Sequence, residues 1–119
     1  MKHNEKDIES IHLRVNTEVK QTELIIHNIY NSCSISTSFT GSPSTLPQLA
    51  EALAAPGEHL VVGDFNLHHP YWGGPRCLTR HAMADKTIEI ATATQLNLLL
   101  PAGTITREQN QQKTTIDLC

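Results

Sequence analysis

Residues 61–74 read VVGDFNLHHPYWGG and place a cluster of polar side chains directly after an apolar run. The run belongs to HLVVGDF at 59–65, which predicts a short buried strand leading into a loop. An acid just beyond the end of a buried strand is held by the sheet, while its side chain projects into the crevice where α/β folds keep their sites. Asp64 occupies this position and is the first candidate for a functional residue.

Asn66 follows Asp64 after one intervening residue. In near-extended geometry the two side chains point to the same side of the chain. A carboxylate can ligate a hard cation or take a proton from water, and an amide can donate to a phosphate oxygen. Together they suit metal-assisted phosphoryl transfer. The alternative is structural, because Asp-x-Asn before a Gly-rich sequence is also a common turn device.

Two strands are predicted before this stretch. Residues 10–20 alternate apolar and polar side chains, which indicates a strand with one buried face. Residues 22–31 are more continuously apolar, which indicates a more buried strand. A short turn at Lys20-Gln21 would join them as a hairpin, so the sheet is expected to be mixed and not purely parallel.

The remaining segments alternate between helix and strand. Residues 32–45 are rich in Ser and Thr and predict a loop, after which Thr45 could cap a helix that begins near Leu46-Pro47 and is stopped by Pro56-Gly57. The patterns further on predict a helix over 79–95 and short strands at 96–100 and 114–119. The class is therefore α/β.

Composition limits the protein to one modest domain of globular type. The chain has 119 residues, of which 39% are hydrophobic and 18% charged. Its formal charge of −3 gives no global basic field, so any binding of nucleic acid must depend on local residues. Cys33, Cys77 and Cys119 lack metal-ligand spacing and are expected to be free thiols. Without a signal peptide or an apolar run of roughly 18 residues, a soluble intracellular protein with no membrane partner is expected.

Four segments carry a resemblance to a known family. GDFN after an apolar strand resembles the signature of the endonuclease/exonuclease/phosphatase family, and GDFNLHHPYWGG is similar to the apurinic-type endonuclease domain of non-LTR retrotransposons, especially fungal ones. HNIYN at 27–31 resembles the strand that presents the family's active-site tyrosine, GTITR at 103–107 its GTxTR segment, and TTIDL at 114–118 a strand that carries an acid. The segments follow the family order, so residues 1–119 are identified as one truncated domain of this kind.

The resemblance implies a fold, an activity and partners. The fold would be a partial two-sheet sandwich flanked by helices, lacking its first and last strands. The activity would be nicking of DNA by water attack on a phosphodiester with Mg²⁺ (or Mn²⁺). DNA would be the substrate, a full-length ancestor would carry a reverse transcriptase domain in the same chain, and the location would be nuclear.

The resemblance also assigns roles to individual residues. Asp64 would activate or orient the water and contribute weakly to the metal site, while Asn66 would hold the phosphate. Tyr30 would donate to the phosphate, and Asp117 would orient the family's catalytic histidine. The residues expected to contact substrate are His69, Trp72, Thr104, Thr106 and Arg107.

The sequence also departs from the family pattern. The N-terminal strand with its asparagine, the glutamate that is the main metal ligand, and the C-terminal Ser-Asp-His segment have no counterpart. The chain therefore reads as an internal fragment with unpaired strand edges and uncovered apolar faces, for which we expect marginal stability and slow catalysis. Two alternatives stay open: a non-catalytic remnant that binds nucleic acid or protein through an open sheet edge, and a relative that acts on a phospholipid or nucleotide phosphate.

Several side chains near the motifs allow more than one interpretation. His68, His69 and His81 could form a zinc cluster, or they could be histidines at the surface or the substrate edge. Tyr71 and Trp72 could stack on a nucleobase, or they could anchor the core and the loop.

Overall fold

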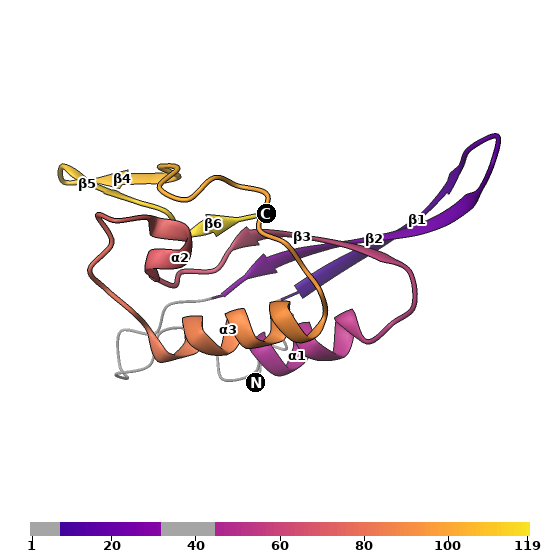
Figure 1. The fold of residues 1–119 in the computed structure, drawn as a ribbon, viewed down its shortest axis with the longest axis horizontal. Helices are drawn as coiled ribbons and strands as arrows, with labels where there is room; N and C mark the ends of the chain where they lie inside the picture. The colour runs from indigo at the N-terminus through magenta and orange to yellow at the C-terminus, as the bar shows by residue number, and fades with distance from the viewer. Residues whose placement is uncertain (1–7, 32–44) are drawn as a thin grey trace, which may run out of the picture.

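The computed structural model describes residues 8–31 and 45–119. In chain order the elements are β1 (Ile8–Asn16), β2 (Gln21–Tyr30), α1 (Thr45–Leu53), β3 (Glu58–Asp64), α2 (Pro70–Gly73), α3 (Ala82–Ala93), β4 (Arg107–Gln109), β5 (Gln112–Thr114) and β6 (Asp117–Leu118) (Figure 1). The predicted loop at 32–45, including Cys33, lies outside the described residues except for Thr45, whereas Cys77 and Cys119 are free thiols. None of the helices in the described ranges is long and apolar enough to cross a membrane.

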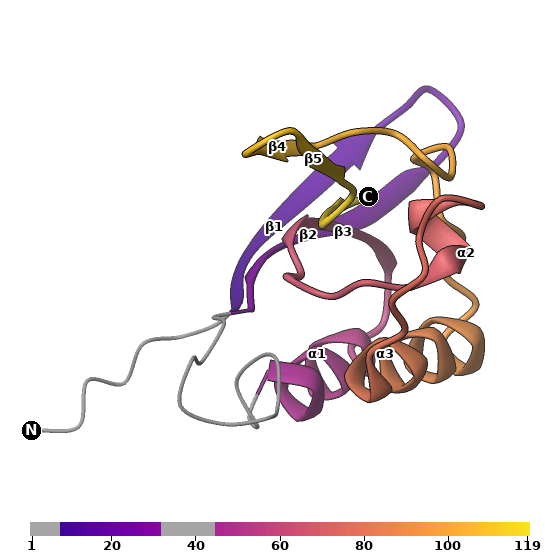
Figure 2. The same ribbon diagram turned by 90° about the vertical axis from the view of Figure 1, so that its left-hand side faces the viewer.

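The main sheet has four strands in the order β1-β2-β3-β6. β2 and β3 are parallel, and the other two pairings are antiparallel, which confirms the mixed α/β sheet. β4 and β5 form a separate two-stranded sheet. Figure 2 shows α1 and α3 together on one face of the main sheet. We call this face the covered face and the opposite one the open face.

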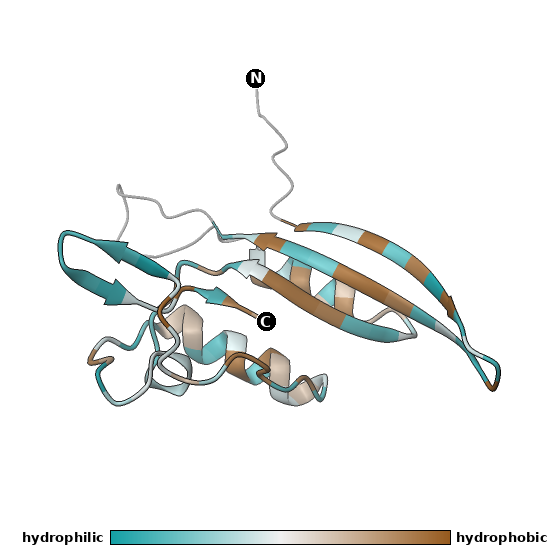
Figure 3. Cartoon of the chain, turned by 90° about the horizontal axis from the view of Figure 1, so that it is seen from above, coloured by the Kyte–Doolittle hydropathy of each residue, from teal (hydrophilic) through white to brown (hydrophobic). Residues whose placement is uncertain are grey.

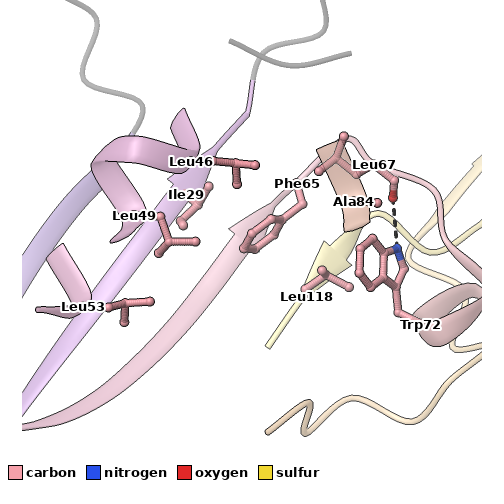
Figure 4. Packing of buried hydrophobic residues seen from close by; sticks show 9 residues of the cluster. All are labelled: Ile29, Leu46, Leu49, Leu53, Phe65, Leu67, Trp72, Ala84 and Leu118. Atoms are coloured by element: carbon pink, nitrogen blue, oxygen red, sulfur yellow. Dashed lines mark hydrogen bonds between the residues drawn. The ribbon is translucent and has the colours of Figure 1, made fainter. Parts of the chain in front are cut away.

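The core lies between the covered face and the helices. Along β2, Ile25, His27 and Ile29 are at most 2% exposed. They alternate with more exposed residues because successive side chains of a strand point to opposite faces. Figure 4 shows Ile29 beside the leucines of α1, with the cluster continuing to Trp72 and Leu118.

The first hairpin turns earlier than the sequence predicted. Asn16 pairs with Gln21, so the turn comprises residues 17–20 and is not centred on Lys20-Gln21. Thr17 closes it: its hydroxyl donates to the carbonyl of Lys20 at 2.8 Å and accepts from the backbone N–H of Lys20 at 3.0 Å. A threonine that bonds its own turn needs neither glycine nor asparagine at the corner.

The predicted strand at 96–100 is wrong. No strand in the described part of the chain pairs with this segment, and Leu96 and Leu98 pack against the core as irregular backbone. A strand pair that the sequence did not predict lies nearby, because Arg107–Thr114 forms the β4–β5 hairpin. Its two corner residues, Asn110 and Gln111, both have positive φ (50° and 66°), as a type I′ turn requires. The strand predicted at 114–119 is reduced to Asp117–Leu118.

The helix predictions hold with changes at the ends. α3 occupies Ala82–Ala93 within the predicted 79–95. Thr45 is the first residue of α1 and does not cap it, since its buried hydroxyl has no hydrogen-bond partner among the described residues. The short helix α2 was not predicted, although His69-Pro70 is a recognisable start: His69 accepts from the backbone N–H of Tyr71, and proline occupies the first helical position.

Candidate active site

Three of the predicted catalytic residues lie side by side on three neighbouring strands. Tyr30 on β2 pairs with Asp64 on β3, and Asp64 pairs with Asp117 on β6. Side chains of directly paired residues share one face of a sheet, so these three project together. They lie on the open face, because Tyr30 follows the buried Ile29 and is 60% exposed. We call Tyr30, Asp64 and Asp117 the catalytic row.

Gly63 allows β3 to bring Asp64 into this row. Its φ is 137°, a value that residues with a side chain rarely adopt. A Cβ atom at this position would lie 2.1 Å from the carbonyl oxygen of Ile29 and 2.7 Å from its nitrogen. Glycine is therefore required for β2 and β3 to approach so closely immediately before the acid.

Asp64 and Asn66 are linked by a turn and are not extended. The backbone N–H of Asn66 donates to Oδ1 of Asp64 at 2.9 Å, and Asn66 has a φ of 48°. The expectation of near-extended geometry was wrong, and the turn interpretation describes the backbone. The Asn66 side chain donates to the carbonyl of Asn31 at 2.7 Å, so it ties the loop after β3 to the end of β2. A role for Asn66 toward phosphate stays a prediction.

Asn31 is a buried residue of the site that the sequence did not single out. It is 1% exposed, its backbone N–H donates to the carbonyl of Asp64 at 2.9 Å, and its side-chain amide donates to the carbonyl of Phe65 at 2.8 Å. These bonds join the end of β2 to the residues on both sides of the β3 terminus. The sequence feature that could have indicated Asn31 is its position directly after an apolar strand, as the last residue of HNIYN.

The environment of Asp64 favours an added positive charge. Burial raises the pKa of Asp64 above its ordinary value, and the negative charge of Asp117 raises it further. The N–H of Asn66 and the charge of Arg107 act in the opposite direction without cancelling the rise. Two carboxyl groups that repel each other are stabilised by a proton or a cation between them.

The carboxyl groups suit one kind of metal ion better than another. Mg²⁺ is commonly held by one or two carboxylates, with water and substrate phosphate as the other ligands, and Asp64 and Asp117 match that pattern. In residues 8–31 and 45–119 no three His, Cys, Asp or Glu side chains are grouped to hold a metal. Two of the ring nitrogens that the zinc alternative needs are also engaged: Nδ1 of His81 accepts from the N–H of His68 at 3.0 Å, and Nδ1 of His69 accepts from the N–H of Tyr71 at 2.9 Å.

His69 and Trp72 have structural contacts. Nε2 of His69 lies 3.2 Å from Oδ1 of Asp85, which links α2 to α3. Trp72 is 2% exposed and donates from Nε1 to the carbonyl of Leu67 at 3.0 Å (Figure 4). The indole ring is inside the core, so the anchoring interpretation of Trp72 is correct and its predicted contact with substrate is wrong. Tyr71 is 58% exposed and remains available for stacking.

The GTITR segment holds β6 of the row in place. The hydroxyl of Thr106 accepts from the backbone N–H groups of Ile116 and Asp117 at 3.0 and 3.1 Å. The hydroxyl of Thr104 donates to the carbonyl of Pro101 at 2.6 Å. Both threonine hydroxyls thus make structural bonds, whereas Arg107 is exposed and its charge reaches Asp64. A contact between Arg107 and a substrate phosphate stays a prediction.

Comparisons with known proteins give two positive findings. The sequence model of a family described as endonuclease-reverse transcriptase matches residues 24–119, a range that contains the catalytic row. Among solved structures, the fold is similar to the endonuclease domain of TRAS1, a telomere-specific non-LTR retrotransposon, with a TM-score of 0.58 and 16% sequence identity. The match covers 97% of this chain and 56% of that one, so the chain spans little more than half the solved domain. No curated protein matches the sequence significantly.

Proposed function

Because the chain belongs to the endonuclease-reverse transcriptase family, we propose that the catalytic row serves metal-dependent hydrolysis of a phosphodiester bond in DNA. The family and the fold bear out the resemblance to retrotransposon endonucleases that the motifs indicated. The observation that carries the proposal is the alignment of Tyr30, Asp64 and Asp117 at one level of three adjacent strands. In longer relatives we propose a reverse transcriptase domain as the partner in the same chain.

The residues of the row divide the chemistry between them. The raised pKa of Asp64 suits a general base, which takes a proton from the attacking water as the phosphorus–oxygen bond to the leaving strand breaks. The Tyr30 hydroxyl, exposed beside it, donates to a phosphate oxygen. Arg107 adds positive charge near the phosphate. Mg²⁺ held by Asp64 and Asp117 would supply Lewis-acid stabilisation of the developing negative charge.

Nicking of supercoiled plasmid by the purified chain tests this function. The variant Asp64→Asn keeps the oxygen that accepts from Asn66 but removes the base, and Glu58→Gln makes the same charge change at the other end of β3. We expect nicking with Mg²⁺ or Mn²⁺ that EDTA abolishes, a decrease of roughly 100-fold or more in Asp64→Asn, and no change in Glu58→Gln. Nicking that survives Asp64→Asn, or a folded protein that never nicks, would contradict the proposal.

One observation favours a second candidate, a domain that binds nucleic acid without cutting it. Within the described ranges the row offers two carboxylates and no third protein ligand for a metal. Under this alternative, DNA binding would depend on salt concentration and survive Asp64→Asn, while plasmid stays intact in every metal.

A further inference from the structure

Asn31 is bonded to three successive residues at the end of β3. Its backbone N–H donates to the carbonyl of Asp64 at 2.9 Å, and its side-chain Nδ2 donates to the carbonyl of Phe65 at 2.8 Å. Its own carbonyl accepts from Nδ2 of Asn66 at 2.7 Å. Tyr30 and Asp64 form the last pair between β2 and β3, so these bonds extend the contact between the two strands beyond the catalytic row.

The peptide unit between Phe65 and Asn66 is held at both ends. Its carbonyl oxygen accepts from Nδ2 of Asn31, and its N–H donates to Oδ1 of Asp64 at 2.9 Å. Because a peptide unit is planar, its carbonyl and its N–H cannot turn independently. A donor on the carbonyl also polarises the unit and strengthens the bond that its N–H makes. The side chain of Asn31 therefore fixes the direction of the N–H that holds the carboxyl group of Asp64.

The turn at Asn66 needs support from its surroundings. Asn66 has a φ of 48°, a left-handed conformation that is unfavourable for a residue with a side chain unless other contacts hold it. The side-chain bond of Asn66 to Asn31 is one such contact. The packing of Phe65 in the core, where it is 4% exposed, is another (Figure 4). The turn is thus fixed to both the end of β2 and the core.

Asn31 supports the catalytic row from behind. Its side chain is 1% exposed, whereas the preceding residue, Tyr30, is 60% exposed on the open face. Successive side chains of an extended chain point to opposite faces, so the amide of Asn31 lies on the buried side of the row. A substrate bound at the open face would therefore meet Tyr30 and Asp64 and not Asn31.

We propose that Asn31 is a positioning residue for the hydrolysis proposed above, because it holds the Phe65–Asn66 peptide unit that engages Oδ1 of Asp64. This inference rests on the proposed function of the catalytic row. With Oδ1 engaged, Oδ2 is the oxygen left to take the proton of the water, since it makes no hydrogen bond with any residue in the described ranges. Loss of the Asn31 amide should lower kcat and leave KM nearly unchanged, because Asn31 does not contact substrate.

The variant Asn31→Leu keeps the branching of the side chain and removes the donor to Phe65. Thr87→Val is the matched control: the hydroxyl of Thr87 also donates to a backbone carbonyl, that of Met83 at 2.9 Å, but it lies on α3. Initial rates of plasmid nicking at several plasmid concentrations give kcat and KM for each folded variant. We expect kcat to fall about tenfold in Asn31→Leu and to stay unchanged in Thr87→Val.

Hydrogen exchange of the Asn66 amide, followed by NMR without metal or DNA, reads the same bond independently of activity. The amide should be protected in the unmodified chain and in Thr87→Val, because it is bonded to Asp64. In Asn31→Leu it should exchange at least about tenfold faster. A merely structural role of Asn31 would lower stability without this selective change at Asn66 and without a change confined to kcat.

The possible outcomes separate this inference from the proposed function. Nicking by Asn31→Leu with the kcat of Thr87→Val would overturn the positioning role and leave the endonuclease function standing. A folded unmodified chain that never nicks would overturn that function and the role of Asn31 within it. If Asn31→Leu does not fold, the unmodified chain decides: exchange of the Asn66 amide at the rate of an exposed amide would overturn the inference, and protection would support it.

Discussion

The two faces of the main sheet are built from the same strands but have different surroundings. On the covered face, Ile25 and Ile29 are 2% exposed beneath α1, whereas on the open face Ile11 and Tyr30 are both 60% exposed. Figure 3 shows the open face, with hydrophobic bands along β1, β2 and β3 and the helices behind them. The covered face holds the core together, and the open face carries the proposed chemistry. Substitutions on the two faces should therefore affect different properties.

The largest effect on the unfolding free energy is expected at Gly63, where β3 lies closest to the backbone of β2. In Gly63→Ala the new Cβ would overlap the backbone of Ile29, so β2 and β3 must separate and both faces are disturbed. We expect a loss on the order of 4 kcal/mol of unfolding free energy, which a domain of this size barely tolerates. Urea unfolding followed by circular dichroism measures it.

Gly103→Ala is the matched control, because Gly103 also has a positive φ, of 85°, but its nearest non-neighbouring atom would be 3.9 Å from the new Cβ. It should cost only the conformational strain, about 1–2 kcal/mol. Equal losses in the two variants would show that steric overlap with Ile29 does not determine the role of Gly63.

Truncating one leucine on each side of the sheet tests the contrast directly. Leu49 of α1 is 3% exposed against the covered face, whereas Leu13 of β1 is 42% exposed on the open face. Leu49→Ala should lower the unfolding free energy by about 2–5 kcal/mol and Leu13→Ala by less than about 1 kcal/mol. A large loss in Leu13→Ala would mean that another surface covers the open face in solution, for example in a dimer, which sedimentation would detect.

The sequence predicted the residues of the site better than the elements between them. Asp64, Tyr30 and Asp117 each end or begin an apolar strand, so local pattern and motif were enough to bring them together. The bond between Asp64 and the backbone of Asn66 depends on a left-handed residue that no apolar pattern reports. The motifs thus identified the residues of the catalytic row, whereas the turn between Asp64 and Asn66 could be seen only in the structure.

The wrong element predictions share a physical cause. The apolar run at 96–100 packs against the core without a strand partner among the described residues, and apolarity alone does not distinguish a buried strand from buried irregular backbone. Arg107–Thr114 is polar throughout and still forms a hairpin, because Asn110 and Gln111 accept the turn conformation. Whether residues 96–100 form a strand depends on pairing with a distant segment, and whether Arg107–Thr114 forms a hairpin depends on the conformation of its turn. A local apolar pattern contains neither kind of information.

Acid should destabilise the covered face through its buried histidine. His59 donates from Nε2 to the carbonyl of Ala55 and accepts at Nδ1 from His27, 2.9 Å away, and His27 in turn accepts from Ser10 at 2.7 Å. Burial, followed by the charges of His59 and His12, lowers the pKa of His27 from 6.5. Below pH 6.5 the unfolded chain takes up a proton that folded His27 resists, so the unfolding free energy should fall as the pH decreases through that value.

Urea unfolding at several pH values between about 8 and 5 measures this slope. His27→Gln should reduce the dependence of the unfolding free energy on pH. His12→Gln, which changes an exposed histidine on β1, should leave most of that dependence in place. Part of the slope should remain in either variant, because burial also lowers the pKa values of His68 and His81. A slope that His27→Gln leaves unchanged would assign the acid sensitivity to that second pair.

The smallest effect should come from the open face, where function and stability are expected to oppose each other at Asp64. The raised pKa of Asp64 means that its ionised form is disfavoured in the folded state, so stability decreases as pH rises above the unfolded value of 3.8. Asp64→Asn should therefore increase the unfolding free energy slightly at neutral pH, by less than about 1 kcal/mol, although it lowers nicking by roughly 100-fold or more.

The same substitution at Asp85 should change the unfolding free energy in the opposite direction. Its hydrogen bond with Arg80 lowers the pKa of Asp85, so Asp85→Asn should decrease stability at neutral pH. Thermal unfolding of the two variants at pH 7 and again near pH 3 compares them, and both differences should shrink as the pH falls below 3.8, where the unfolded carboxyl groups take up protons. A loss of stability in Asp64→Asn at neutral pH would mean that its carboxylate is already compensated, by Arg107 or by a bound cation, and that the open face is less strained than its two adjacent carboxyl groups indicate.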